Sequence, residues 1–147
     1  MGGGTPQFWT IFGFLSGTQP KHRRGAPRLE RLAEKLRTLR ILAEHGVWLV
    51  DASFHGVSLR KGARLNPQTV GSLQRLWWMN YGRSIIERER PERIVAIGKG
   101  VHASMKDDMQ FDAWIYQPQG VRNPDQKRHN DEVLQSLHSW IWRENSQ

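Results

Sequence analysis

Hydrophobic positions along the chain form two kinds of segment, long stripes with helical spacing and short continuous runs. The helical spacing predicts helices over residues 7–17, 28–46, 68–90 and about 131–143, with a shorter one at 100–109. The short runs at 47–50, 94–97 and 112–116 lie between these helices, and short apolar runs are typical of buried strands in a parallel sheet. This βαβ order predicts an α/β fold, a three-layer α/β/α sandwich with a short parallel sheet.

The apolar stripes also predict which side chains face the core. In the helix at 28–46 they are Leu29, Leu32, Ala33, Leu36, Leu39, Leu42 and Ala43, with Gly46 as the left-handed cap. In the helix at 68–90 they are Val70, Leu73, Leu76, Trp77, Tyr81 and Ile85. In the last helix they are Val133, Leu134, Leu137, Trp140 and Ile141.

Length and composition narrow the class of protein further. The 147 residues predict a single domain over 1–147, with a flexible start at 1–6. We expect no membrane span, because every apolar window is shorter than the ~18 residues that one requires, and we see no secretory leader. The absence of cysteine excludes disulfides and thiolate metal sites and fits a cytoplasmic location. We further expect a monomer.

Chemistry-bearing side chains follow each of the predicted strands. The three groups are Asp51, Ser53 and His55; Lys99 and His102; and Gln117–Gly120. Parallel strands bring their carboxyl ends to one edge of a sheet, where ligands bind, so these loops should line one cleft. For Asp51 the alternative is a turn cap, and for His55 a loop histidine with no role. The segment Gly98-Lys99-Gly100 fits strand-to-helix packing better than a phosphate loop, because the other P-loop residues are absent.

The charge balance points to an anionic partner. The net charge is +8, and basic residues gather at 21–24 and at 60–64. Such loops either contact phosphates, as expected for DNA, or keep the protein soluble. The six histidines show no metal-binding spacing, so we expect neither a metal nor a cofactor.

Four segments in order resemble one known family. They are the helix start Gln7-Phe8-Trp9, the run 46–51, the strand 91–99 ending in Gly-Lys, and Gln117-Pro118-Gln119-Gly120 before a helix that ends in Trp. The chain from about 7 to 142 is similar to the uracil-DNA glycosylase superfamily, especially its compact mismatch-specific branch. The resemblance implies hydrolysis of the N-glycosidic bond of a base flipped out of DNA.

The resemblance also implies roles for individual residues. Asp51, Gln117 and Pro118 correspond to base-binding positions. Under this interpretation we expect contacts with DNA or its phosphates at Ser53, His55, Lys61, Arg64, Lys99, Gly120 and Arg122, which lie in the basic loops or beside the predicted cleft. Gln117 stands where the family has His or Asn, and glutamine cannot carry the positive charge of a histidine. Asp51 stands where the family usually has Asn, and a carboxylate only accepts hydrogen bonds.

The family's first motif, a strand ending in Gly-x-x-Pro with the water-activating Asp or Asn, has no counterpart here. Either the chain is shortened at its N-terminus and lacks this first strand, which we favour, or its sheet is rearranged. We assign no catalytic residue. The alternatives are a non-catalytic domain that binds nucleic acid or a nucleotide, and a structural remnant without a function of its own.

Overall fold

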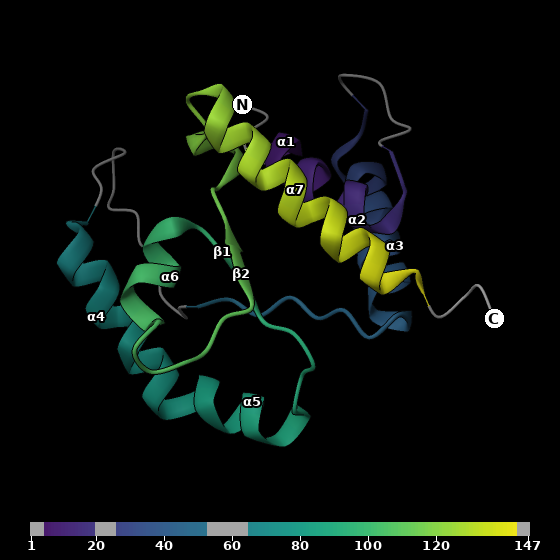
Figure 1. Ribbon diagram of the computed structural model, residues 1–147. Coiled ribbons are helices and arrows are strands. Elements are labelled where there is room, and N and C mark those ends of the chain that lie inside the picture. The colour runs from purple at the N-terminus through teal and green to yellow at the C-terminus, as the bar shows by residue number, and fades with distance from the viewer. Residues whose placement is uncertain (1–4, 20–25, 53–64, 144–147) are drawn as a thin grey trace. The chain divides into compact units, whose positions relative to one another are not determined.

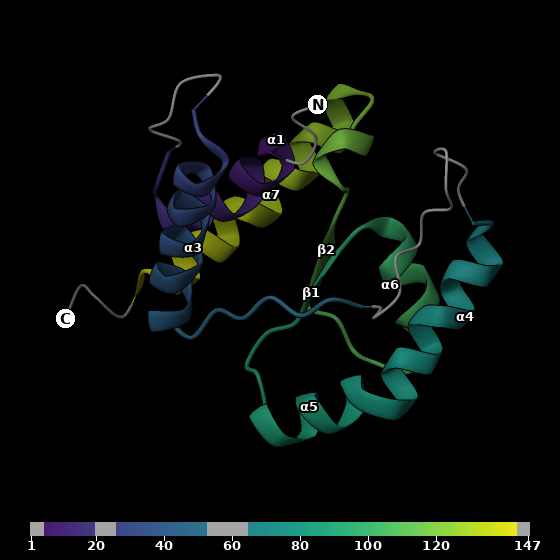
Figure 2. The same ribbon diagram turned by 180° about the vertical axis from the view of Figure 1, so that it is seen from behind.

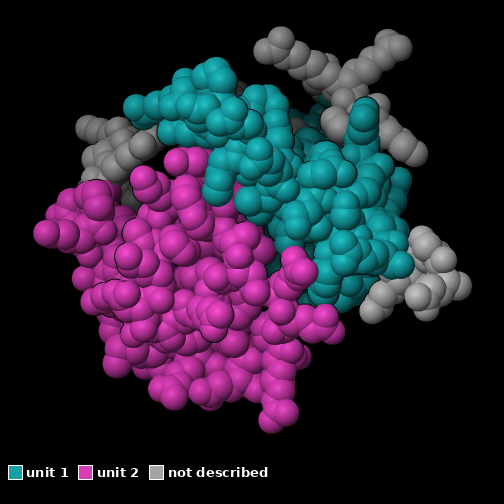
Figure 3. Space-filling model, in the orientation of Figure 1, with its two compact units in different colours: residues 1–49, 118–147 teal, residues 50–117 magenta. Residues whose placement is uncertain are grey.

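The computed structural model describes residues 5–19, 26–52 and 65–143, which form a mixed α/β structure with a short parallel sheet (Figures 1 and 2). The chain divides into two compact units, coloured separately in Figure 3. Unit 1 comprises residues 1–49 and 118–147, and unit 2 comprises residues 50–117. The expectation of a single domain stays a prediction.

The sheet of unit 2 consists of β1 (Val95–Ile97) and β2 (Ala113–Ile115), which run parallel with Val95 opposite Ala113. Helix α6 (Lys99–Met105) connects them and packs against both strands. Ala96 and Ile115, one from each strand, are buried. The strands predicted at 94–97 and 112–116, and their parallel direction, are confirmed.

A bent helix covers α6 in unit 2. It runs through α4 (Pro67–Trp77), the π-helical turn η3 (Trp78–Gly82) and α5 (Arg83–Glu89), and it changes direction between α4 and α5 (Figures 1 and 2). A π-helical turn inserts an extra residue and commonly bends a helix. The insertion also shifts the inward face, so that Gly82 is buried where the regular spacing predicted Tyr81. Tyr81 and Leu76 were predicted to face inward, but they are 53% and 56% exposed.

The core of unit 2 lies between this helix and α6. Trp77, Trp78 and Met105 are its buried centre. The partly buried side chains packed against them are Ala52, Ile86, Val101, Met109 and Phe111. The hydroxyl of Ser104 on α6 also donates a hydrogen bond to the Gln74 carboxamide on α4. These contacts fix α6, and therefore the position of its first residues beside β1.

The strand predicted at 47–50 is wrong, because these residues form no strand. Trp48, Leu49 and Val50 are 78%, 51% and 45% exposed. The backbone N–H of Val47 donates to the carbonyl of Leu42 (2.9 Å), and that of Gly46 to Ala43 (3.0 Å). This pair of bonds is a Schellman cap. The run therefore begins as the end of a helix and finds no strand partner among the described residues.

The regular secondary structure in the described residues of unit 1 is entirely helical. Its elements are α1 (Thr5–Phe8), the π-helical turn η1 (Trp9–Gly13), α2 (Phe14–Ser16), α3 (Arg28–Glu44), the short 3-10 helix η4 (Pro118–Gly120) and α7 (Pro124–Ile141). Helix α7 begins earlier than predicted, because the Asn123 side chain caps it by accepting from the N–H of Gln126 (2.9 Å). The buried apolar residues are Ile11, Leu15, Leu42, Leu134 and Ile141.

Helix α3 has its expected extent but not its expected orientation. The side chains that it buries are Glu34, Thr38 and Leu42. The predicted core residues Leu29, Leu32 and Leu36 are instead 78%, 49% and 57% exposed. Hydrogen bonds explain why a polar residue faces inward, since the Thr38 hydroxyl donates to the Glu34 carbonyl (3.2 Å) and bonds the Thr18 hydroxyl (3.1 Å). Apolar periodicity finds a stripe but does not register such polar partners.

None of the helices in the described residues is both long enough and apolar enough to cross a membrane.

Candidate functional site

The carboxyl edge of the sheet brings the predicted site residue Gln117 into contact with Gly98, which was not among the predicted site residues. Gly98 directly follows β1, and its N–H donates to the carbonyl of Ile115 at the end of β2 (2.8 Å). Gln117 leaves β2 two residues later. A side chain at Gly98 would place its Cβ 3.5 Å from both Cγ and Nε2 of Gln117. The Gln117 side chain therefore lies across the backbone of Gly98.

The backbone at Gly98 requires glycine. Its φ is +113°, a conformation that residues with a side chain rarely adopt. The chain turns there from β1 into α6, and the next residue, Lys99, is the first of that helix and is exposed. The turn thus leaves an exposed cation beside the Gly98–Gln117 contact, with the Gln117 side chain itself exposed.

An aromatic cluster, defined as His102, Phe111, Trp114 and Tyr116, is formed by α6 and the chain in and around β2. The His102 ring on α6 stacks on Trp114 of β2, with 5.8 Å between centroids and 19° between planes. Trp114 contacts Tyr116 edge-on at 4.8 Å, and His102 contacts Phe111 at 5.5 Å. All four rings are partly buried. Planar ligands such as bases stack on aromatic ring faces that the protein leaves uncovered.

Sequence reasoning did not find the aromatic cluster as a unit. Trp114 and Tyr116 are two apart in a strand, so a common face could have been inferred from their spacing. Their contact with His102 depends on how α6 packs on β2, and helix packing is not encoded in any local pattern.

Other predicted site residues have different outcomes. Asp51 is exposed, and it follows no strand, so the reason for placing it at the sheet edge is lost. Pro118, Gly120 and Arg122 belong to unit 1, where Pro118 and Gly120 form η4 and the Arg122 N–H donates to the Gln126 side chain (2.8 Å). The remaining positions, Ser53, His55, Lys61 and Arg64, lie outside the described residues.

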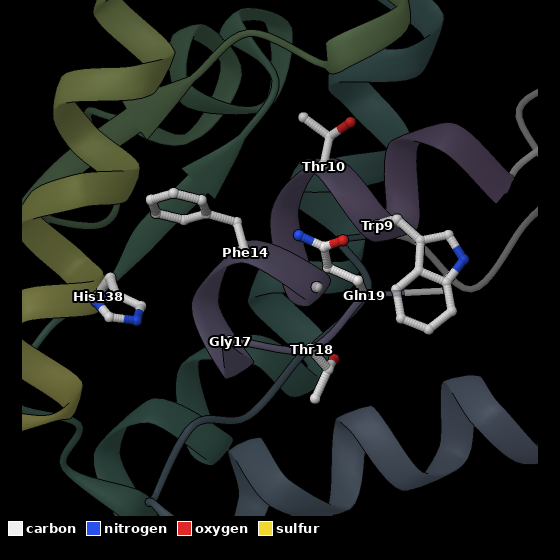
Figure 4. A pocket seen from close by; sticks show the side chains of 8 residues that line it. Trp9, Thr10, Phe14, Gly17, Thr18, Gln19 and His138 are labelled. Carbon is white, nitrogen blue, oxygen red and sulfur yellow. The ribbon is translucent and has the colours of Figure 1, made fainter. Parts of the chain in front are cut away.

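Unit 1 contains a separate hollow of about 470 Å³ (Figure 4). The described residues that line it are Trp9, Thr10, Gly13, Phe14, Gly17, Thr18, Gln19 and His138. The Phe14 ring contacts the His138 ring (5.6 Å between centroids). The Thr18 hydroxyl is hydrogen-bonded to the Ser16 hydroxyl (2.7 Å). None of the predicted site residues lines this hollow, and its lining offers mainly apolar contact.

Metal-binding geometry is absent from the described part of the chain, where no group of three or more histidine or carboxylate side chains could hold an ion. Comparison of the chain with protein-family models, curated proteins and solved structures gave no match. The chemistry of the site therefore has to be inferred from its own residues.

Proposed function

We propose that this chain is a uracil-DNA glycosylase-like domain that binds a base of DNA at the carboxyl edge of β1 and β2. The proposal includes the three-layer sandwich expected for that class. It rests on one observation above all, that the exposed Gln117 side chain lies across Gly98 where two adjacent parallel strands end. Ligands of open α/β sheets bind beyond this edge.

The residues at the edge suit recognition of a nucleobase. The carboxamide of Gln117 donates and accepts hydrogen bonds, as the edge of a base does. Gly98 has no side chain, which leaves room for the Gln117 side chain to lie across its backbone. The exposed Lys99 supplies a cation for a phosphate, and the net charge of +8 favours a polyanion. The partly buried rings of the aromatic cluster pack against one another around the strand that leads to Gln117.

Base excision is the catalytic form of this proposal. Water would add to the sugar carbon as the N-glycosidic bond breaks, and the products are a free base and an abasic site. Gln117 can hold the base, but it neither takes a proton from water nor carries a charge. We therefore assign recognition to Gln117 and no residue to hydrolysis. The alternative is binding of nucleic acid without excision.

Binding and excision can be measured together on the purified full chain. Fluorescent oligonucleotides, single-stranded and duplex, with and without uracil, serve as ligands, and alkaline cleavage reports abasic sites. We expect Gln117→Ala to weaken binding about tenfold, as for loss of a two-point base contact. The matched control is Gln119→Ala, which removes another exposed carboxamide two residues away.

The outcomes separate the candidates. Base release by the wild-type chain supports the glycosylase, and binding without release supports the non-catalytic alternative. Failure to bind any of the oligonucleotides, or equal effects of Gln117→Ala and Gln119→Ala, overturns the site. Lys99→Gln should weaken binding severalfold on every oligonucleotide, because a phosphate contact carries no sequence information. Lys106→Gln, at the exposed C-cap of the same helix, should not.

A further inference from the structure

Helix α3, labelled in Figure 2, carries an apolar seam apart from the residues that it buries. The seam consists of Leu29, Leu32, Leu36, Leu39 and Ala43, which follow one another at alternating spacings of three and four residues. This is the spacing with which one helix packs along another. Leu29, Leu32 and Leu36 are 78%, 49% and 57% exposed, Ala43 is exposed and Leu39 is partly buried.

The seam is not the face with which α3 packs in unit 1. Glu34, Thr38 and Leu42 are the buried residues of this helix, and they lie on its other side. The hydrogen bond between the Thr38 and Thr18 hydroxyls holds that side in place. An apolar surface of this kind on a folded protein usually marks a contact with another molecule.

The charges beside the seam indicate what kind of molecule. Counting Leu29 as the first position of a heptad, the flanking positions that bear charge are Arg28, Lys35 and Arg40. All three are basic. The Arg40 side chain is 81% exposed, and its ion pair with Glu44 (3.1 Å) lies on the surface, where such pairs are weak. A second copy of α3 would set basic residues against basic residues, so self-pairing is disfavoured in either direction.

We propose that α3 is a docking surface for an amphipathic helix of an acidic protein partner. The partner helix presents leucine-type side chains to the seam and Asp or Glu to Arg28 and Arg40. The seam spans two heptads, so the interaction resembles a helix laid on an apolar surface more than an extended coiled coil. This inference is independent of DNA binding, since α3 belongs to unit 1 and the proposed base site to unit 2.

A pair of labelled peptides tests the proposal on the full chain. Each has about eighteen residues with leucine at the seam positions, and they differ in having either glutamate or lysine at the flanking positions. We expect the glutamate peptide to bind at least tenfold more tightly in fluorescence anisotropy. Arg28→Glu combined with Arg40→Glu should reverse this preference, because the flanking charges select the partner.

Substitutions in the seam supply the second arm. Leu32→Gln with Leu36→Gln should weaken the glutamate peptide at least tenfold, whereas Leu76→Gln, which changes a comparably exposed leucine in α4, should not. The melting temperature should fall by less than about 4 °C in these variants. A larger fall in melting temperature overturns the proposal, because it means that the chain itself covers the seam. Equal binding of both peptides, or dimerisation through the seam, also overturns it. Seam-dependent binding to anionic phospholipid vesicles without peptide binding also overturns it.

Discussion

The runs at 47–50 and 94–97 are both four consecutive apolar residues, yet only the second contains a strand. The second run is followed by a βα turn and a helix that returns the chain beside it as β2. The first run follows a helix whose cap uses the N–H of Val47. Hydrophobicity makes a strand possible, but a partner that satisfies its backbone makes it form.

The largest expected difference between the sheet and the run at 47–50 is how much one apolar side chain contributes to the free energy of unfolding. Ile115 of β2 is 1% exposed, whereas Leu49 is 51% exposed. Ile115→Ala should lower the free energy of unfolding by about 2–5 kcal/mol, because it opens a cavity in the core. Leu49→Ala should lower it by less than about 0.5 kcal/mol. Urea unfolding followed by circular dichroism gives both values, and similar values for the two variants would mean that the run at 47–50 is buried.

Each run adjoins a glycine with positive φ, and these glycines sharpen the comparison. Gly98 has φ +113° and ψ 127°, while Gly46 has φ +74°. Gly98→Ala should destabilise by about 1–3 kcal/mol, because its conformation is closed to other residues. Gly46→Ala should lower the free energy of unfolding by about 1 kcal/mol, since residues with a side chain can adopt the left-handed helical conformation at a smaller penalty. A reversed order of melting temperatures would contradict this ranking.

A smaller effect than at Ile115 or Gly98 is expected at the start of β1. The carboxylate of Asp112 accepts from the Ile94 N–H (2.7 Å), and the Asp112 N–H donates to the Ile94 carbonyl (2.8 Å). Asp112→Ala should therefore lower the free energy of unfolding by about 1 kcal/mol. Asp112→Asn keeps an acceptor oxygen and should cost less. Faster hydrogen exchange of the Ile94 amide in Asp112→Ala alone would locate the effect, and equal exchange in both variants would contradict it.

The sequence was sufficient where local pattern and chain order determine the structure. The helix ends near Gly46 and Pro91, the two parallel strands and the position of Gln117 at their carboxyl edge all follow from pattern and chain order. It was insufficient where long-range packing decides. The burial of Thr38 depends on the Thr18 hydroxyl, twenty residues away. The strand at 47–50 lacked a partner, and that lack cannot be seen in the run itself.

The candidate site shows the same division. Two adjacent parallel strands bring Lys99 and Gln117 to the same edge of the sheet, so sequence order was enough to expect this, but the contact of Gln117 with Gly98 was not predicted. The loss of Asp51 from the predicted edge follows from the missing strand before it. The stack of His102 on Trp114 depends on how closely α6 packs on β2 and on which face it turns toward the strand. Contacts of α6 with α4 fix that position.

The close approach of Trp77 to Gly82 has a consequence for how this sequence can diverge. A Cβ at position 82 would lie 2.3 Å from the Trp77 ring, nearer than atoms can approach. Any homologue that gains a side chain at 82 must therefore move or replace the indole. We expect the two positions to change together across evolution, with glycine kept wherever tryptophan is kept.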